Sequence, residues 1–494
     1  MGWHAAKNSI GKTRKDLDSH GAEALAVARA ADRAADDIES LKTKLANLRQ
    51  HAHELHMALN PTTNTFAPAE GSTLTQSEAD AADAALRPEL AAILAEAAAI
   101  DDELAQAINM ATGKTPIPTD AGPPVGPDGL TPTQIASDAN QARLEEERRE
   151  TKAKVDALQR QVDAAAVQAY TSGQSPMSPD QVKALGTELN AAKAHLAELD
   201  AVHSALGNAP ETYLTVFDPR NGTGKQVLAA IAVGNPDTAK NVSVTVPGIG
   251  STTKDTLGGM VTEARALQHE TERQLARAGL PPSVATIAWM GYDPAPNPLN
   301  TLSPGDLWAT MIDDRAQAGA QSLSSYLEQV RANNPNGHIT LFGHSYGSLT
   351  SSLALQELNA KGVHPVNDVV FYGTPGLELN NADQLGLGSG HAYVMNGAKD
   401  PIPGWIAPFT QLHGWGTDPR LGMLPILSAE AGTDLTGVPR LGVDNHADYA
   451  RPDNNGQLRM SGYNLAAVLA GLPNNEIKLA PPTQVDLPIG ARSK

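Results

Sequence analysis

The chain has no cysteine among its 494 residues. Disulfides, a thiol nucleophile and thiolate metal ligands are therefore excluded, although the compartment is not fixed by this absence. Aromatic residues are scarce, at 4%, so the composition gives no sign of a groove that stacks on sugars. Acidic residues outnumber basic ones and give a formal net charge of −18. That excess argues against partners such as nucleic acid or an anionic membrane surface.

Long apolar runs are missing as well. A membrane-spanning helix needs about 18 consecutive apolar residues, and the sequence has no such run. The first residues, Met1 to Asn8, have no apolar core of the signal-peptide kind. We therefore expect no transmembrane segment, and a protein that is cytoplasmic or exported without a cleaved signal peptide. Histidines and acidic residues show no metal-ligand spacing, so no metal or other cofactor is expected.

The most informative segment runs from His338 to Leu349 and predicts a strand, a sharp turn and a helix. The turn has the pattern Gly-x-Ser-x-Gly, formed by Gly343, Ser345 and Gly347. Glycines are needed where strand and helix approach too closely for a side chain, and the serine is then presented as a nucleophile. The N–H of Tyr346, at the start of the helix, would face a developing oxyanion. The alternative is an ordinary Gly/Ser turn.

Before the serine motif, residues 1–206 are rich in Ala, Glu and Leu with helical periodicity. A heptad seam from Leu17 to Leu59 predicts one long helix. Three further apolar stripes predict helices over about Ser77 to Ala111, Gln134 to Tyr170 and Val182 to Leu199. Pro/Gly-rich linkers lie near 60–76 and 113–132. We expect an all-α antiparallel bundle, suited to self-association or to docking a protein partner.

Residues 207–472 show a different pattern, short β-branched runs that alternate with helices. Such a pattern predicts an α/β domain with a mainly parallel sheet. The expected strands are Tyr213–Phe217, Val227–Val233, Val242–Val246, Val284–Trp289, His338–Phe342, Val369–Tyr372 and Ala392–Met395. The expected helices between later strands are Thr256–Ala278, Asp306–Asn333 and Gly347–Ala360. Residues 473–494 form a Pro-rich tail that we expect to be loosely ordered.

A serine nucleophile needs a base that is held by a carboxylate, and in this fold the chain order is Ser, acid, His. Asp400 follows a predicted strand, where sheets of this type place functional groups. An aspartate in a turn before proline is the alternative reading. His446, in a polar loop further on, is the expected base, and His413 is its competitor.

The second oxyanion donor should come from the loop after the strand Val242–Val246. Glycines in that loop let backbone N–H groups turn inward, so Ile249 or Gly250 is expected to donate. The segment Asn221 to Gln226 looks like a phosphate-binding loop but lacks its leading glycine and its Ser/Thr. It therefore predicts a hairpin turn.

These motifs resemble those of a family of actinobacterial α/β hydrolases that is still catalogued as a domain of unknown function. The resemblance covers about 207–472 and is carried by Val246-Pro-Gly-Ile-Gly-Ser, Gly343-His-Ser-Tyr-Gly-Ser, Tyr372-Gly-Thr-Pro-Gly376, Asn396 to Asp400 and His446-Ala-Asp-Tyr449. It implies an α/β-hydrolase fold and the triad Ser345, Asp400 and His446, and it implies no particular substrate.

The N-terminal helices are similar to those that precede this domain in mycobacterial proteins. There, a helical hairpin related to type VII secretion substrates carries a Trp-x-Gly turn. Here Trp3 is followed by His4 and Ala5, a departure from that pattern. The resemblance implies export by a route of the type VII kind, and the departure at Trp3 counts against it.

The sequence as a whole predicts a serine hydrolase that acts on a small-molecule or lipid carboxylic ester through an acyl-serine intermediate. Thioesters and amides would use the same residues. The rival from another class is a non-catalytic docking or secretion-associated protein that retains the hydrolase scaffold.

Overall fold

The computed structural model describes most of the chain outside its ends and several loops. It covers residues 41–111 (without 43, 47, 62 and 70), 130–172, 177–207, 211–219, 226–295, 314–388, 390–402, 423–472 and 476–481. Two compact units are present, residues 1–121 with 388–390, and residues 122–387 with 391–494. The units therefore divide the chain near residue 121 and not near 206, because the third and fourth predicted helices pack with the sheet.

The first unit contains helical residues 41–42, 44–46 and 48–54, strands β1 (Met57–Asn60) and β2 (Thr65–Pro68), and helix α2 (Gln76–Ala111). An antiparallel hairpin thus replaces the expected end of the long helix at Leu59 and the linker after it. Turn chemistry explains the difference. The side chain of Asn60 accepts a hydrogen bond from the N–H of Thr63 at 3.3 Å, and its carbonyl accepts from the N–H of Asn64 at 2.9 Å. Asn64 has a φ of 52°, which asparagine tolerates well. The part of the expected heptad helix before residue 41 lies outside the described residues.

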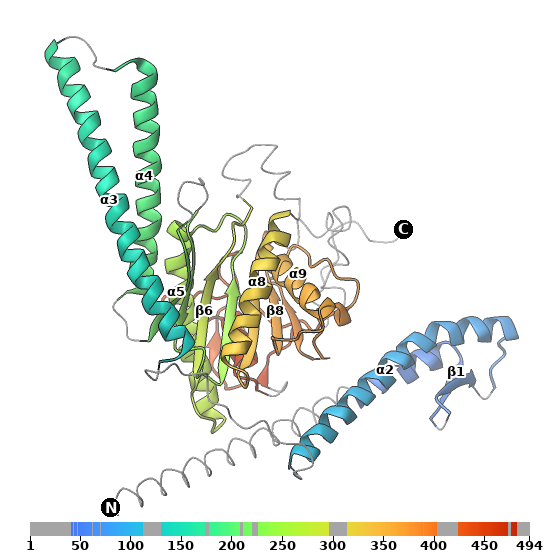
Figure 1. Ribbon diagram of the computed structural model, residues 1–494. Coiled ribbons are helices and arrows are strands. Elements are labelled where there is room, and N and C mark those ends of the chain that lie inside the picture. Colours follow the sequence, from blue (N-terminus) through green and yellow to red (C-terminus); the bar gives the residue numbers. More distant parts are fainter. Residues whose placement is uncertain are drawn as a thin grey trace, which may run out of the picture. The chain divides into compact units, whose positions relative to one another are not determined.

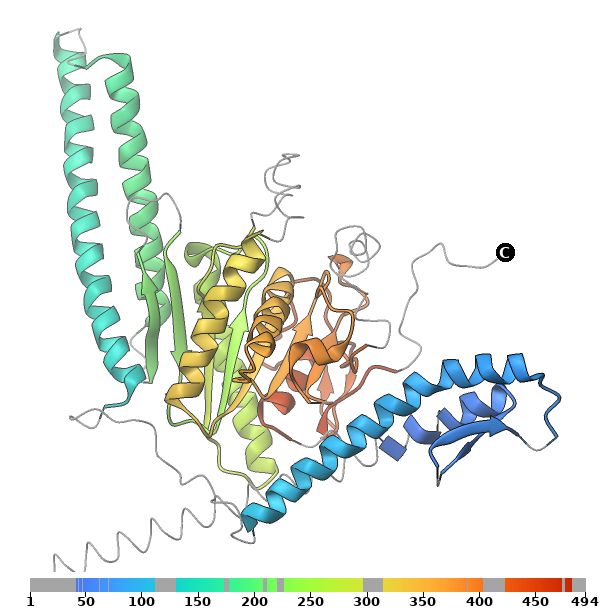
Figure 2. The ribbon, with the colours of Figure 1, turned by 45° about the vertical axis from the view of Figure 1, so that its right-hand side comes forward.

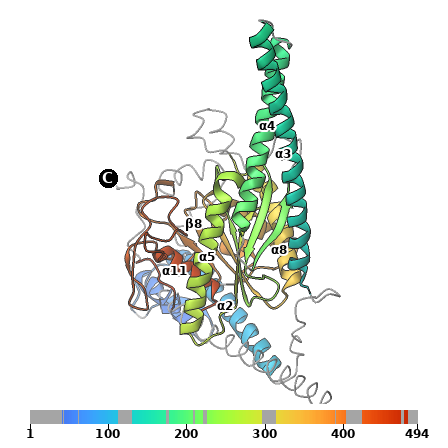
Figure 3. The same cartoon turned by 90° about the vertical axis from the view of Figure 1, so that its left-hand side faces the viewer.

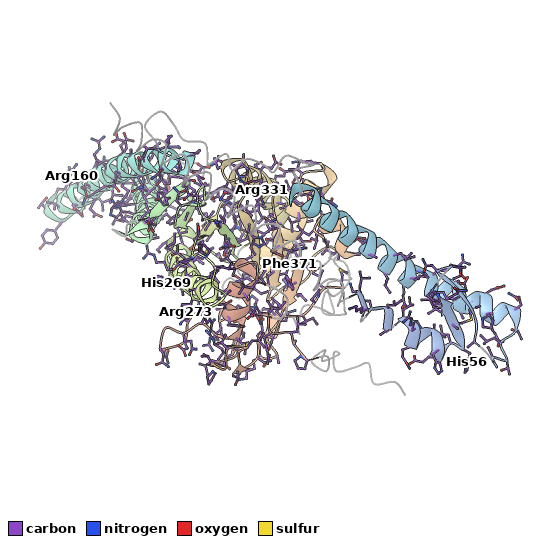
Figure 4. All side chains as sticks on the ribbon, turned by 90° about the horizontal axis from the view of Figure 1, so that it is seen from below. His56, Arg160, His269, Arg273, Arg331 and Phe371 are labelled. Atoms are coloured by element: carbon purple, nitrogen blue, oxygen red, sulfur yellow. The ribbon has the colours of Figure 1, made fainter. Side chains whose placement is uncertain are left out.

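The second unit begins with two antiparallel helices, α3 (Pro132–Ser172) and α4 (Pro179–Leu206), which lie side by side in Figures 1 and 2. Helix α4 starts at a capping box made by Ser178 and Gln181. Near the sheet, the hairpin contributes Leu144, Leu199, Val202 and Leu206 to a core shared with the first strands. Further along α3, Arg160 lies on the part that extends beyond the sheet (Figure 4).

The sheet of the second unit has seven strands in the order β3-β4-β6-β5-β7-β8-β9. Their bounds are β3 Thr212–Asp218, β4 Leu228–Val233, β5 Asn241–Val246, β6 Val284–Met290, β7 His338–His344, β8 Asp368–Tyr372 and β9 Ala392–Met395. Within this sheet β4 alone runs against its neighbours, and the later strands are parallel. All seven expected strands are present to within two residues at each end, so the mainly parallel sheet is confirmed. The antiparallel pairing of β3 and β4 fits the expected hairpin, although its turn residues lie outside the described ones.

Helices cover both faces of the sheet (Figures 1 and 3). On one face are α8 (Asp314–Asn333) and α9 (Tyr346–Ala360), and on the other are α5 (Thr253–Arg277) and α11 (Met460–Leu469). Side chains alternate along each strand, so Val244 packs toward α8 and α9 whereas Phe342 packs toward α5 and α11. Figure 4 labels Phe371 of β8 within the sheet, where it is fully buried. Short elements η1 (Ala382–Leu385), β10 (Gly432–Thr433) and β11 (Pro439–Arg440) complete the unit.

Helix α3 covers the edge strand β3, and side chains of α3 form hydrogen bonds with the backbone of that strand. The N–H of Leu214 donates to Ser137 Oγ at 3.0 Å, and Asn140 donates to the carbonyl of Leu214 at 2.9 Å. The buried carboxylate of Asp237 accepts the N–H of Thr133 at 2.7 Å and so fixes the start of α3. Covering an edge in this way removes a template for strand addition.

Among the described residues, every helix is too short or too polar to cross a membrane.

Candidate active site

Ser345 stands between the end of β7 and the start of α9, as the sequence predicted. Its φ of 54° and ψ of −126° place a non-glycine residue in a sparsely populated region. Such a conformation costs about 1–3 kcal/mol and persists only where the surroundings enforce it. One restraint is a hydrogen bond from the N–H of Ser345 to the carbonyl of Tyr372, at 2.9 Å.

The two glycines of the motif are required by close approach. A Cβ on Gly343 would lie 2.7 Å from the Cα of Ser348, and one on Gly347 would lie 2.5 Å from the carbonyl oxygen of Pro247. Both neighbours are backbone atoms that cannot move aside. The serine is therefore held on a turn that admits no side chain on either flank.

Asp400 and His446 are brought together from distant parts of the chain. The Nδ1 atom of His446 lies 2.8 Å from Oδ2 and 3.0 Å from Oδ1 of Asp400. Asp400 also accepts the N–H of Ile402 at 3.0 Å and the hydroxyl of Tyr449 at 2.8 Å. The competing histidine, His413, lies outside the described residues.

The electrostatics of this pair favour a charged aspartate. Burial acts to raise the pKa of Asp400, but the hydrogen bond and charge of His446, with the donors Ile402 and Tyr449, outweigh burial. The pKa of Asp400 therefore lies below its usual value. A carboxylate that stays ionised holds the imidazole with its proton on Nδ1, which leaves Nε2 as an acceptor.

The Nε2 atom of His446 is buried and has no hydrogen-bond partner among the described residues, Ser345 included. In sites without substrate the bond between nucleophile and base is often long and tightens on binding. The free Nε2 atom is what a base for the hydroxyl of Ser345 requires.

His344, the residue before Ser345, lies against the base. Its ring centroid is 4.8 Å from that of His446, and its Nε2 lies 2.9 Å from the carbonyl oxygen of His446. Burial lowers the pKa of His344 to about 3, and the neighbouring His446 adds to this effect. Adjacency to the serine was the one signal for this residue in the sequence.

The loop after β5 reaches Ser345. Of the two backbone N–H groups expected to bind the oxyanion, one already has a hydrogen-bond partner. The N–H of Gly250 is used, since it donates to the carbonyl of Ala295 at 2.8 Å. Gly250, which we expected as a possible oxyanion donor, instead uses its N–H to hold the loop in place. Of the two expected donors, Ile249 is the one that is left. Gly248, which the sequence did not single out, lies closest to the serine, because a Cβ there would be 2.6 Å from the Cβ of Ser345.

The described residues contain no group of three or more His, Asp or Glu side chains that could hold a metal ion.

A mainly parallel sheet, with a strained serine between the end of an inner strand and a helix, defines the α/β-hydrolase fold. Residues 218–410 match the family described as alpha/beta hydrolase. The chain is 40% identical over 218 residues to the uncharacterized protein Rv0963c of Mycobacterium tuberculosis, a match that spans 43% of this chain and 76% of that protein. The chain therefore belongs to the alpha/beta hydrolase family.

Other comparisons are more distant or cover less. Residues 2–151 match a second family, described as uncharacterised protein Rv0964c. The uncharacterized protein Rv2079 of Mycobacterium tuberculosis is 34% identical over 237 residues, 47% of this chain and 33% of that protein. Among solved structures, a Pyrobaculum calidifontis esterase is 14% identical, with 60% of this chain and 97% of that chain covered at a TM-score of 0.28. Carboxyl esterase 2 of Tuber melanosporum is 13% identical, with 55% and 89% covered at a TM-score of 0.28.

Proposed function

We propose that the chain is a serine hydrolase that cleaves carboxylic esters through an acyl-serine intermediate. One observation carries the proposal. His446 Nδ1 lies 2.8 Å from an ionised, buried Asp400, while Ser345 is held at a φ of 54° on the adjoining turn. A nucleophile, a base and a carboxylate that orients the base are the three parts that this chemistry needs.

In the proposed reaction, Ser345 Oγ attacks the ester carbonyl while His446 Nε2 takes its proton. His446 then gives that proton to the leaving alcohol as the C–O bond breaks. Water attacks the acyl-serine, again with His446 as base, and the acid leaves as Ser345 is reprotonated. The N–H groups of Tyr346 and Ile249 are the proposed oxyanion donors, each worth about 3 kcal/mol in barrier height.

We place esters before amides because an alkoxide is a better leaving group than an amide anion, so the C–O bond breaks with less help from the proton that His446 supplies. Thioesters and amides remain alternatives that use the same residues. The other class, a non-catalytic docking protein, would not need its serine in a costly backbone conformation or a buried carboxylate aimed at a histidine. Those two features favour an enzyme.

The test is covalent labelling with a fluorophosphonate, followed by turnover of p-nitrophenyl esters of increasing chain length. We expect one label per chain by intact mass, lost in Ser345→Ala. Ser325→Ala is the matched control, since Ser325 is an exposed helix residue whose hydroxyl only bonds the carbonyl of Gln321. Labelling that persists in Ser345→Ala would refute the nucleophile. A wild-type chain that neither labels nor turns over any ester would favour the docking protein.

A further inference from the structure

Tyr449 occupies a buried position beside Asp400, with a side chain that is 1% exposed. Its hydroxyl accepts a hydrogen bond from the N–H of Gly397 at 2.8 Å and lies 2.8 Å from Asp400 Oδ2. A backbone N–H can only donate and a carboxylate can only accept. The proton of the phenol must therefore point at Asp400.

The ring of Tyr449 has little freedom to move away from this contact. Its centroid lies 5.5 Å from that of Tyr372, and its backbone carbonyl accepts from Ser461 Oγ at 2.6 Å. Gly373, with a φ of 57°, lies close to both Tyr449 and Asp400. A Cβ on Gly373 would be 3.1 Å from Tyr449 Cε2 and 3.1 Å from Asp400 Oδ2.

We propose that Tyr449 is a positioning residue that fixes the carboxylate of Asp400 and limits its pull on the proton of His446. The inference rests on the proposed serine hydrolase function. Oδ2 of Asp400 accepts from both Tyr449 and His446 Nδ1, each at 2.8 Å. A second donor on one oxygen neutralises part of its charge, so less of that charge stabilises a protonated imidazole.

The phenol remains a neutral donor throughout the working range. Burial raises the pKa of Tyr449 well above 10, and the charge of Asp400 raises it further. Its other titratable neighbours include Tyr372 and His344, whose rings lie 5.5 Å and 6.0 Å away, and Glu430, which accepts the N–H of Ala398 at 2.7 Å. The Asp400 carboxylate is the group that receives the phenol's hydrogen bond.

The experiment is Tyr449→Phe in the full chain, with pH–rate profiles for a soluble ester. Loss of the hydroxyl leaves more of the charge of Asp400 for His446. We expect the acidic limb of kcat/KM to move to higher pH by about half a unit or more. We expect kcat to fall about 10-fold, far less than the ~10⁴-fold loss of a triad member, with KM little changed.

Tyr463→Phe is the matched control. Its ring is also 1% exposed, and its hydroxyl donates to the carbonyl of Glu476 at 3.0 Å, away from Asp400. We expect this variant to be less stable with an unmoved pH profile. A purely structural role for Tyr449 would make the two variants behave alike.

A second variant covers the case in which Tyr449→Phe does not fold. Incorporation of 3-fluorotyrosine at position 449 keeps the shape and strengthens the donor, and ring flipping can turn its one fluorine away from Gly373. We expect the acidic limb to move to lower pH, the opposite direction. NMR titration of the His446 ring, assigned by its loss in His446→Ala, gives the same midpoints without turnover.

Identical midpoints in the wild type, in Tyr449→Phe and in the 3-fluorotyrosine protein would overturn the inference. The proposed function would still stand in that case if the fluorophosphonate labels Ser345. Failure of that labelling in the wild type would remove the proposed function. The NMR titration would then still decide whether Tyr449 acts on His446.

Discussion

His344 donates the proton on its Nε2 to the backbone carbonyl of His446 across 2.9 Å. The direction is fixed because a carbonyl oxygen only accepts. The residue before the serine therefore holds the loop that carries the proposed base. Either a neutral or a charged imidazole can make this contact; it is burial that keeps His344 neutral, by lowering its pKa to about 3.

The first prediction concerns the pH dependence of stability. His344 has a pKa of about 6.5 when unfolded and about 3 when folded, so between these values the unfolded state binds the extra proton. Its contribution to stability is fully present above about 6.5 and is lost as the pH falls toward 3, with a slope of at most about 1.4 kcal/mol per pH unit. His344→Gln keeps an N–H donor for the carbonyl but does not titrate.

We expect the free energy of unfolding, measured with urea at pH 7, 6 and 5, to fall less steeply in His344→Gln than in the wild type. We compare how steeply the unfolding free energy changes with pH, because Gln also changes the packing. A packing change alters the unfolding free energy by the same amount at each pH and leaves the slope unchanged. Parallel curves for the two proteins would contradict a buried, neutral His344.

A second prediction tests the carboxylate. Asp400→Asn keeps an oxygen for the N–H of Ile402 but replaces the oxygen that faces His446 and Tyr449 with an NH₂ group. The imidazole loses the nearer of its two acceptor oxygens and the negative charge that sets its tautomer, and turnover near neutral pH should fall about 10⁴-fold. Steady-state kinetics on a soluble ester checks this.

Asp368→Asn is the matched control for that variant. Asp368 is also buried and lies 2.6 Å from His338 and 2.8 Å from His391, but at the opposite end of β8 from Tyr372. We expect it to lower stability and to leave kcat within a few-fold. Equal losses of activity in both variants would mean that the carboxylates act only through folding.

A third prediction concerns Gly248. Its added Cβ would lie 2.6 Å from the Cβ and 3.1 Å from the Oγ of Ser345, so Gly248→Ala must displace the nucleophile or the oxyanion loop. We expect a loss of turnover of about 10²-fold or more, because small misplacements of reacting groups are costly. Gly258→Ala, at an exposed helix position with open space around it, should keep full activity and gain about 1 kcal/mol of stability. Full activity in Gly248→Ala would place the loop elsewhere during catalysis.

Local sequence patterns were enough to predict most of the α/β domain. The seven strands are β-branched runs that end at turn residues, and the serine turn is specified by two glycines that its geometry requires. The pairing of Asp400 with His446 followed from chain order in the fold and from the chemistry of the serine. Each of these depends on neighbours in sequence or on a fixed topology.

Non-local contacts account for the differences. Apolar stripes predicted the helices α3 and α4, but a stripe does not say which surface covers it. Leu144 and Leu199 in fact pack in one core with the first strands of the sheet. The N–H of Gly250 is taken by Ala295, in a segment far along the chain. In the first unit, the chain leaves the helix before His56, whose φ is 55°, and the turn from Asn60 to Asn64 then pairs β1 with β2. A few tenths of a kcal/mol of heptad propensity do not outweigh this turn chemistry.

The last prediction concerns the helical hairpin, where the structure changes what a shortened chain should do. Leu199, Val202 and Leu206 of α4 pack in one core with Leu214 and Met260 of the sheet domain. Each buried aliphatic side chain of this kind is worth about 2 kcal/mol.

Backbone contacts point the same way. Asp237 holds the start of α3, Ser137 covers the N–H of Leu214, and Glu198 accepts the N–H of Val227 at 2.8 Å. A chain of residues 207–494 would expose this apolar face and leave those groups without their partners. A chain of residues 122–494 keeps the whole second compact unit.

We therefore expect residues 122–494 to be soluble, to melt cooperatively by circular dichroism and to keep esterase activity and fluorophosphonate labelling. Residues 207–494 should aggregate or melt at a markedly lower temperature. The two chains are compared at equal concentration by size-exclusion chromatography, since aggregation of the exposed face depends on concentration. A stable and fully active 207–494 chain would show that α3 and α4 are an appended module. An inactive but folded 122–494 chain would instead assign the first unit a part in the active site.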